Sequence, residues 1–199
     1  MQVLVILAHP NPGSFNHAIA GKVVDVLQRK GYQVIFHDLH AEQFEPRITY
    51  EEIPKGALLD KNLERHCNDL INADGIIFIH PNWWGQPPAI MKGWIDRVFR
   101  PGIAYQFHED DPGVGVPDGL LKAGIAMVFN TSDTPEQRER EVFGDPLDRL
   151  WKNNLNYCGV KRIVRKTFGV IVTSSLEQRR GWLDEVENMV GEYFPEIGI

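Results

Sequence analysis

Short runs of β-branched and aromatic residues alternate with helix-like segments along the whole chain, and this alternation constrains the fold more than any other feature. Each run is followed by a segment with helical periodicity, and the first and third are nearly continuous apolar runs, as expected for strands covered on both faces. Five runs fit strands: Gln2–Ala8, Tyr32–Leu39, Gly75–His80, Ala123–Asn130 and Ile163–Thr173. Repeated β-α units predict a parallel sheet with helices on both faces, a doubly wound α/β fold.

The segments between these runs carry start and stop signals of helices. Ser14 is placed to cap one helix, with Gly31 as its C-terminal stop. A helix that starts at Pro135 is expected to break near Pro146, because proline lacks the amide hydrogen that a helix needs. The other helices are predicted over Leu59–Ala73, Ala89–Arg100, Pro135–Trp151 and Glu177–Phe194. No repeat or linker divides the chain, so residues 1–199 are expected to form a single domain.

Charge, cysteine content and apolar length exclude several classes of protein. The formal charge of −6 argues against nonspecific binding to nucleic acid or to an anionic membrane, because both need a cationic surface. Cys67 and Cys158 have no metal-ligand spacing and are expected to be free thiols in a reducing compartment. The apolar run from Val3 to Ala8 is too short for a signal sequence or a membrane span. We therefore expect a cytoplasmic protein without nucleic-acid partner or integral membrane segment.

The first strand ends in a turn rich in proline and glycine that leads into the capped helix. This segment reads His9-Pro10-Asn11-Pro12-Gly13-Ser14-Phe15-Asn16-His17-Ala18. It contains neither the Gly-x-Gly-x-x-Gly dinucleotide fingerprint nor a P-loop. The N–H groups and the positive dipole end at the start of the helix can bind an anion. Taken alone, an ordinary capped helix after a turn is an equally good interpretation.

Two adjacent tryptophans follow the third strand, in the loop Pro81-Asn82-Trp83-Trp84-Gly85. An aromatic side chain in a loop at the carboxyl end of a strand is well placed to lie against a flat ring. Prolines at positions 81, 87 and 88 stiffen this loop. The alternative is a buried structural pair of tryptophans, whereas Trp94 in the following helix is expected in the core.

With these residues the chain resembles the flavodoxin-like NAD(P)H:quinone oxidoreductase family, which includes DT-diaphorase and bacterial relatives. The resemblance rests on His9-Pro10 with Ser14-Phe15-Asn16-His17-Ala18, and on Pro81 and Trp84 with Pro88-Ala89-Ile90-Met91-Lys92-Gly93-Trp94. Ala104-Tyr105, Gly144-Asp145 and Cys158-Gly159 extend it over nearly the whole chain. It implies a flavodoxin-like five-stranded sheet, a bound flavin, and transfer of two electrons from NAD(P)H to a quinone or similar small acceptor by a ping-pong mechanism.

The resemblance also implies which residues form the site. The phosphate or pyrophosphate end of the flavin falls to His9, Ser14, Phe15, Asn16 and Ala18. The isoalloxazine falls to Pro81, Asn82, Trp83, Trp84 and Gly85, and the loop after the fourth strand adds Asn130, Thr131, Ser132 and Asp133. The acceptor pocket is expected to hold Trp84, Tyr105, Phe107 and Phe143, with the tyrosine supplied by the partner subunit of a homodimer. The Ser-Phe-Asn sequence favours FAD, with FMN as the alternative.

The chain departs from the family at the residues that assist charge transfer. Phe143 stands in place of a histidine, Phe107 stands where a second pocket tyrosine is common, and no tyrosine lies between Ser132 and Phe143. No catalytic side chain is therefore assigned, and the flavin is expected to carry the chemistry. Backbone N–H groups of residues 131–134 are expected to stabilise the negative charge of the reduced flavin, aided by the helix that Pro135 begins.

Two other functions stay open. An electron-carrier flavodoxin would bind the same cofactor, although the first loop lacks the Thr-Gly-x-Thr pattern of flavodoxins. An ancillary regulator of a membrane transporter is the second alternative, since the resembled family includes such members.

Other motifs are given structural interpretations. His37-Asp38-Leu39-His40 has a metal-like spacing, but histidines at a strand end are more often solvated or hydrogen-bonded, so no metal site is predicted. His17 beside Ser14 is explained as part of the flavin loop, and no Ser-His-Asp arrangement is expected. The insertions Ala41–Gly56 and Gln106–Gly119 are expected to be functional or interfacial, and the acidic residues 108–111 are expected to be solvated or to lie at a dimer contact.

Overall fold

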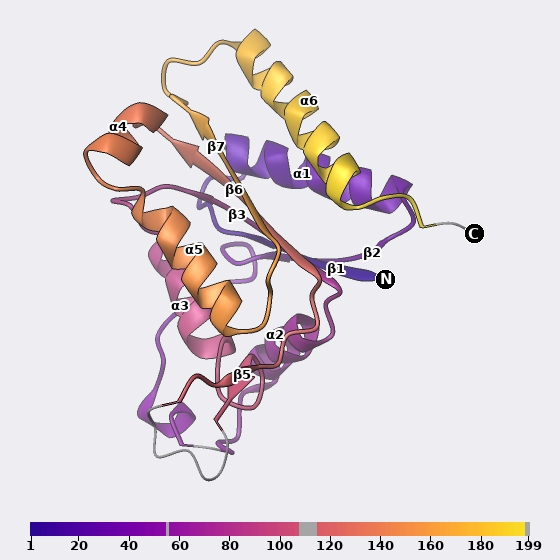
Figure 1. Ribbon diagram of the computed structural model, residues 1–199, viewed down its shortest axis with the longest axis vertical. Helices are drawn as coiled ribbons and strands as arrows, with labels where there is room; N and C mark the ends of the chain where they lie inside the picture. Colours follow the sequence, from indigo (N-terminus) through magenta and orange to yellow (C-terminus); the bar gives the residue numbers. More distant parts are fainter. Residues whose placement is uncertain (55, 108–114, 198–199) are drawn as a thin grey trace.

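A sheet of five parallel strands in the order β2-β1-β3-β6-β7 forms the centre of the computed structural model, which describes residues 1–54, 56–107 and 115–197 (Figure 1). The strands are β1 (Gln2–Leu7), β2 (Gln33–Asp38), β3 (Gly75–Pro81), β6 (Ile125–Ser132) and β7 (Ile163–Gly169). This is the flavodoxin-like order of a doubly wound sheet. The order in which strands are added to the sheet reverses between β1 and β3, while all strands stay parallel. The predicted fold class is confirmed.

Helices cover both faces of this sheet (Figure 1). One face carries α1 (Phe15–Arg29) and α6 (Leu176–Tyr193). The other face carries α2 (Lys61–Ile71), α3 (Ala89–Val98) and α5 (Pro146–Tyr157). The short helix α4 (Glu136–Glu141) follows β6, and a 3-10 turn spans Tyr50–Glu52.

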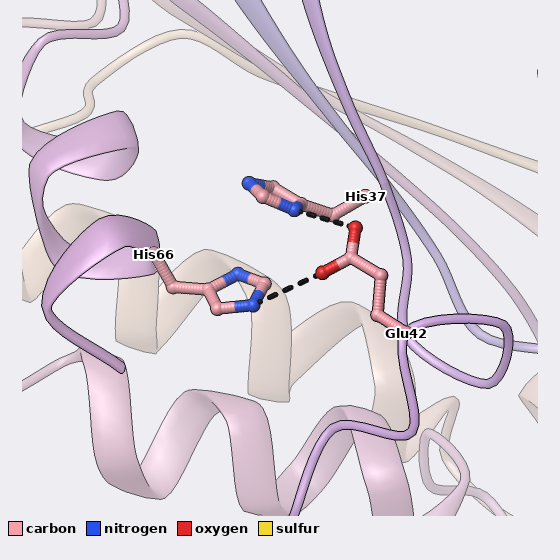
Figure 2. Close-up of side chains that lie close together, drawn as sticks. All are labelled: His37, Glu42 and His66. Carbon is pink, nitrogen blue, oxygen red and sulfur yellow. Dashed lines mark hydrogen bonds and ion pairs between the residues drawn. The ribbon is translucent and has the colours of Figure 1, made fainter. Parts of the chain in front are cut away.

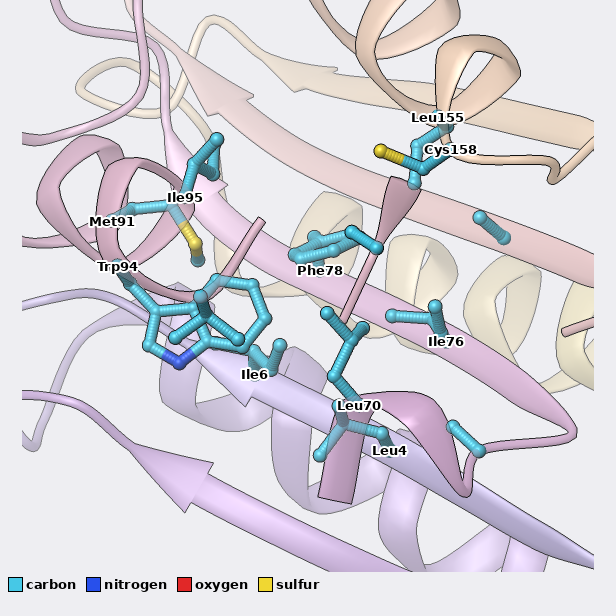
Figure 3. Close-up of a cluster of buried hydrophobic side chains, with 14 of the residues drawn as sticks. Leu4, Ile6, Leu70, Ile76, Phe78, Met91, Trp94, Ile95, Leu155 and Cys158 are labelled. Atoms are coloured by element: carbon cyan, nitrogen blue, oxygen red, sulfur yellow. The ribbon is translucent and has the colours of Figure 1, made fainter. Parts of the chain in front are cut away.

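Each central strand contributes to a core on either side, because successive side chains point to opposite faces. Val3, Val5 and Leu7 of β1 pack beneath α1 and α6, whereas Leu4 and Ile6 belong to the opposite core. Figure 3 shows Ile6 and Phe78 of this second core close to Trp94, which is fully buried as predicted. Burial on both faces explains why the first and third strands are almost entirely apolar.

The helix signals hold at most boundaries. The Ser14 side chain caps α1 by accepting from the His17 N–H, and Gly31 after its end has a φ of +85°. The predicted break is present, since α4 ends at Glu141 and α5 begins with Pro146 at its first position. Pro135, expected to be the first residue of α4, lies one residue before the helix.

The last strand and one insertion differ from expectation. The strand predicted over Ile163–Thr173 ends at Gly169, because the chain then bends over the end of β6, where the Ile171 N–H donates to the Ser132 carbonyl at 3.1 Å. The insertion Gln106–Gly119 is flanked by a small antiparallel pair, β4 (Tyr105–Gln106) with β5 (Asp118–Gly119). Its acidic residues 108–111 lie outside the described residues.

A buried arginine on α3 anchors the other insertion, residues 41–56. Arg97 donates to both carboxylate oxygens of Glu52, at 2.9 and 2.8 Å, and to the Glu45 carbonyl at 2.6 Å. Gly93 allows this insertion to approach α3, since a Cβ there would lie 2.2 Å from the Pro46 carbonyl oxygen. The buried ion pair fixes a long loop that has little regular structure of its own.

Candidate functional site

Three loops meet at the carboxyl ends of β1, β3 and β6 and surround a cavity of about 390 Å³. It is lined by His9, Asn11, Gly13, Ser14, Phe15, Asn16, Pro81, Asn82, Trp83, Thr131, Ser132, Asp133, Thr134, Ile171 and Arg179. The cavity lies at the switch point between β1 and β3, where open α/β sheets bind their ligands. Sequence segments separated by more than a hundred residues are therefore brought together at the expected place.

The first loop is shaped by hydrogen bonds within itself. The Gly13 N–H donates to Asn11 Oδ1 at 2.9 Å, and the Asn11 N–H donates to His9 Nδ1 at 3.1 Å. Burial lowers the pKa of His9. The start of α1 faces the cavity, so its N–H groups and dipole are available to an anion.

Asn16 carries a buried acceptor with no partner inside the protein. Its side chain is 2% exposed, and Nδ2 donates to Thr131 Oγ1 at 2.9 Å. Its Oδ1 is also buried and has no hydrogen-bond partner. An unpaired buried acceptor costs roughly 1–3 kcal/mol, so this atom fits a ligand that offers a hydroxyl or N–H donor. A phosphate dianion offers no donor to this oxygen, so the predicted contact of Asn16 with the phosphate does not involve Oδ1 and stays a prediction.

Phe15 and Ala18, which were both predicted to hold the phosphate end, do not present their side chains to the cavity alone. Phe15 lines the cavity, but its ring packs against Trp182 and Phe168, with centroid distances of 5.7 and 6.3 Å. Ala18 is exposed on α1 and does not line the cavity. Within this chain, Ala18 is thus not brought to the site.

The second loop presents its tryptophans to solvent. Trp84 is fully exposed and Trp83 is 45% exposed, so the alternative of a buried structural pair is wrong. Trp84 has a φ of +57°, in a tight turn closed by a pair of bonds between Trp83 and Gln86 at 3.0 and 3.1 Å. Asn82 Oδ1 accepts from the Gly85 N–H at 2.9 Å. The turn therefore holds an apolar ring in water, where only a ligand or another chain can cover it.

The third loop is joined to the second. The Asn82 N–H donates to the Thr131 carbonyl at 2.6 Å, and Ser132 Oγ accepts from the Thr134 N–H at 3.0 Å. Asp133 uses its carboxylate to accept from the Val172 N–H at 2.8 Å. These bonds fix residues 131–134 beside the cavity, as the sequence analysis expected.

A buried polar network lies beneath the second and third loops. His80 is completely buried, with Nδ1 2.9 Å from the Pro81 carbonyl oxygen and Nε2 3.0 Å from Trp151 Nε1. The indole N–H can only donate, so Nε2 holds the lone pair and Nδ1 donates its proton to Pro81. Asn130 Nδ2 also donates to His80 Nε2, at 2.9 Å, rather than reaching the cavity itself. Burial lowers the pKa of His80 to about 4, so this ring is neutral at neutral pH.

The network continues to the start of α5. Arg165 donates to Asn130 Oδ1 at 3.2 Å and pairs with Asp145, the cap of that helix. Gly85 lies against the same helix start, since a Cβ there would lie 2.5 Å from Pro146 Cγ. The loop that carries Trp84, the end of β6 and the start of α5 are therefore held as one unit.

The structure does not bring the four predicted acceptor-pocket residues together within one chain. Trp84 and Phe143 are exposed, and neither Tyr105 nor Phe107 lines the cavity. Tyr105 instead packs against Phe107 and Tyr157, at centroid distances of 5.9 and 5.2 Å. Within one chain, the cavity at the switch point is therefore not the predicted acceptor pocket.

Four residues of the cavity were not assigned to the site from the sequence: Asn11 and Gly13 lie within the first loop, whereas Ile171 and Arg179 lie outside all three loops. Arg179 donates to Ser174 Oγ at 2.8 Å and to the Ile171 carbonyl at 2.9 Å. Both residues reach the cavity because the chain turns sharply after Gly169, and the segment had been predicted as strand. No local motif marks them, so only the tertiary path of the chain reveals their role.

A second cluster of candidate ligands lies on the other side of the sheet, where His37, Glu42 and His66 converge (Figure 2). His37 Nδ1 lies 2.8 Å and His66 Nε2 lies 3.3 Å from the two oxygens of Glu42. Burial alone would raise the pKa of Glu42, but the contacts with both histidines lower it to about 2. The metal-like spacing in the sequence joins His37 with His40 instead.

The proton positions in this cluster oppose metal binding. Trp94 Nε1 donates to His66 Nδ1 at 3.2 Å, so the proton of the neutral ring is on Nε2 and no lone pair faces Glu42. Metal-bound histidines instead donate their second N–H to an acceptor. Arg65 adds a cation 2.8 Å from Glu42. At His66 this arrangement favours a buried ion-pair network, whereas His37 Nε2 lies 2.9 Å from Asp69 Oδ2. The absence of a metal site stays a prediction.

The fold and the cavity define a doubly wound α/β protein with a binding site for a cofactor at its switch point. The chain belongs to the family described as the flavodoxin-like fold (Flavodoxin_2), which matches residues 1–186. It is 33% identical over 176 residues to a protein of Haemophilus influenzae named "uncharacterized NAD(P)H oxidoreductase", covering 86% of this chain and 85% of that protein. Over 204 residues it is 32% identical to human ribosyldihydronicotinamide dehydrogenase (quinone), covering 90% and 86%.

The chain is also similar to a solved structure over nearly its whole length. Smu.1420 from Streptococcus mutans UA159 has a TM-score of 0.83 at 30% identity and covers 96% of this chain and 100% of that chain. The resemblance to the NAD(P)H:quinone oxidoreductase family is thereby confirmed, and at the level of the family the chain is an oxidoreductase. None of the helices in the described part of the chain combines the length and the apolar character of a membrane span.

Proposed function

We propose that the chain is a flavin-dependent NAD(P)H oxidoreductase, a single domain over residues 1–199 that passes two electrons to a quinone or similar small acceptor by a ping-pong mechanism. The unpaired acceptor of Asn16 carries this proposal, because it is buried in a cavity at the sheet's switch point. The hydroxyl groups of a ribityl chain supply the donor that this atom lacks. A flavin therefore fits the residues that are present.

The three loops have separate tasks in this proposal. The start of α1, with His9 and Ser14, holds the phosphate end, and the turn of Trp83 and Trp84 lies along the isoalloxazine. The bound flavin supplies the chemistry of accepting a hydride and passing on two electrons. Backbone N–H groups of residues 131–134 stabilise the charge that develops at the ring, except that of Thr134, which donates to Ser132 Oγ. No side chain in the described site is assigned as a general acid.

Reduction by nucleotide tests this function directly. NADH or NADPH added to the purified holoprotein should bleach the flavin absorbance within seconds. A flavodoxin-type electron carrier would not be reduced on this timescale without a separate reductase. Mass spectrometry of flavin released by heat identifies the cofactor, for which we propose FAD with FMN as the alternative.

A homodimer completes the acceptor pocket in this proposal. Tyr105 and Phe107 lie outside the cavity of their own chain, beside an open groove of about 750 Å³ with an apolar lining. The exposed ring of Phe107 and the apolar side chains of Ile53 and Leu59 border this groove. Sedimentation should show a dimer at micromolar concentration. A fully active monomer would exclude a shared pocket.

The two thiols agree with a cytoplasmic location, which we retain as a prediction. Cys67 and Cys158 are both free and buried, and burial raises the pKa of each to about 11. Thiols that stay protonated and are shielded from solvent react slowly with oxidants. A fractionation experiment with the tagged protein checks the location.

A further inference from the structure

Three polar side chains form a continuous line beside the phosphate end of the cavity. Ser14 Oγ lies 2.9 Å from His17 Nδ1, and His17 Nε2 lies 3.0 Å from Asp38 Oδ2. Ser14 and His17 are at the start of α1, and Asp38 is the last residue of β2. The side chains of His17 and Asp38 are 19% and 16% exposed, so solvent reaches the line only in part.

The partners of Asp38 fix the direction of these hydrogen bonds. Its Oδ1 accepts from the N–H groups of His40 and Ala41, both at 3.1 Å, so the carboxylate acts as an acceptor throughout. His17 must therefore present Nε2–H to Asp38, and in the neutral ring Nδ1 carries the lone pair. The Ser14 hydroxyl then donates to His17, and its hydrogen points away from an incoming anion.

This arrangement differs from the triad of a serine hydrolase. In that triad Nε2 faces the serine and Nδ1 faces the carboxylate, whereas in this chain the ring is reversed. Ser14 Oγ also accepts from the His17 N–H at 3.4 Å, as a helix cap. The three side chains therefore lie at the start of a helix, and helix starts bind anions.

We propose that the Ser14–His17–Asp38 line takes up one proton when a phosphate group binds at the start of α1. The proton comes from solvent and enters at His17 Nδ1, which then donates to Ser14 Oγ. The Ser14 hydroxyl turns and donates its own hydrogen to a phosphate oxygen. Asp38 stabilises the imidazolium. His17 is a positioning residue in this scheme, because it acts on the phosphate through Ser14. The inference rests on the proposed function, since the phosphate belongs to the flavin.

The partners of its second nitrogen distinguish His17 from the neighbouring histidines. The His9 ring faces His17 with a centroid distance of 6.4 Å and in turn faces His40. Burial lowers the pKa of His9, and the two neighbouring histidines lower it further. Of these three histidines, only His17 has a carboxylate on its second nitrogen, where Asp38 can accept a hydrogen bond from the imidazolium. Across the cavity, Arg179 is held by Ser174 and Ile171.

The proposal also has an independent indication of a ligand. Asn16 lines the same cavity, and its buried Oδ1 has no hydrogen-bond partner within the described protein. The start of α1 is therefore part of a built site and not merely a helix terminus.

Calorimetry of cofactor binding tests the proton uptake. The flavin-free protein is titrated with FMN, FAD and riboflavin at pH 7.5 to 9, above the phosphate pKa of about 6, in buffers with different enthalpies of ionisation. We expect uptake of up to one proton with FMN and FAD and none with riboflavin, which lacks phosphate. FMN affinity should fall by up to tenfold per pH unit, the limit for one linked proton, while riboflavin affinity stays constant.

Variants locate the proton. His17→Gln keeps a polar side chain that cannot be protonated, so it should abolish the uptake and flatten the pH dependence of FMN affinity. Asp38→Asn should reduce the uptake, whereas His40→Gln is the matched control and should retain it. Uptake that persists in His17→Gln, or that disappears in His9→Gln alone, overturns the inference.

The wild-type titrations separate this inference from the proposed function. If the protein binds no flavin, the proposed function is wrong. If it binds FMN without proton uptake at any pH in this range, the function stands and the relay does not. The wild-type measurement alone is decisive, even where a variant fails to fold.

Discussion

The two ends of the cavity are built differently. At the end proposed for the phosphate, Ser14 is at least half-buried and is hydrogen-bonded to His17, and the neighbouring Asn16 is bonded to Thr131. At the ring end, Trp84 is fully exposed on a turn closed by backbone bonds. The first end is preorganised for a charged group, whereas the second presents apolar surface that its own chain does not cover. Charge recognition needs fixed dipoles in advance, but stacking needs only a flat partner.

The scaffold beneath the exposed turn is nevertheless rigid. His80 binds the Pro81 carbonyl from below, and Trp151 and Asn130 hold the ring of His80 in one tautomer. Hydrogen bonds therefore fix the residues beneath the turn, while Trp84 at its tip is exposed to solvent. Four predictions test the contributions of the buried scaffold, of Asn16, of Trp84 and of the backbone donors. They are given from the largest expected effect to the smallest.

The buried base of the ring end should make the protein sensitive to acid. His80 has its pKa lowered to about 4, so it is neutral in the folded protein while the unfolded chain binds a proton near pH 6.5. Stability is thus fully present above pH 6.5 and is lost as the pH falls towards 4, by up to about 3 kcal/mol. Denaturant unfolding across this range should show a smaller pH dependence for His80→Gln than for the wild type. Equal slopes would contradict the assignment.

Replacement of Asn16 should weaken binding of every flavin, because its acceptor fits a hydroxyl and not the phosphate. Asn16→Leu removes this acceptor and the bond to Thr131. We expect a loss of about 2 kcal/mol, roughly 30-fold in Kd, for FMN and riboflavin alike. Fluorescence titration measures both affinities. Thr131→Val is the control, since it breaks the internal bond but leaves Oδ1, and it should have the smaller effect.

Replacement of Trp84 should affect binding without affecting folding. Its ring is fully exposed, so Trp84→Ala should change the free energy of unfolding by less than about 0.5 kcal/mol. Loss of stacking should cost about 1 kcal/mol in flavin affinity, roughly fivefold. Tyr50→Ala is a matched control, because Tyr50 is also exposed but lies outside the cavity. Unchanged affinity and turnover in Trp84→Ala would show that the tryptophan does not contact the flavin.

The rate of flavin reduction should be nearly independent of pH. Backbone N–H groups do not titrate, and His80 remains neutral well above its pKa of about 4. Stopped-flow reduction by NADH or NADPH between mildly acidic and mildly basic pH measures this rate in the loaded protein. A rate that does not change with pH would show that no group near the flavin ring titrates in this range. If flavin binding is also linked to proton uptake, the titrating group lies at the end proposed for the phosphate. A steep profile that vanishes in a variant of His9, His17 or His80 would reveal a titrating group that takes part in flavin reduction.

The sequence was most informative where the physical signal is local. Apolar runs identified all five strands of the central sheet, Ser14 marked the start of α1, and Pro146 marked the break before α5. The prolines and tryptophans after β3 indicated a rigid loop at the right end of the sheet. These features depend on neighbouring residues and on periodicity, which can be observed in the chain itself.

Only the tertiary structure decided which distant side chains meet. Asp38 reaches His17, and Arg179 reaches the cavity, because parallel strands bring their carboxyl ends to one edge of the sheet. The tautomer of His80 likewise depends on Trp151, 71 residues further along the chain. No spacing in the sequence encodes these contacts, since each arises from the path of the backbone after folding. The sequence by itself determined the main elements of the sheet and the loops that line the cavity, and the packing of those elements determined which side chains lie within hydrogen-bonding distance there.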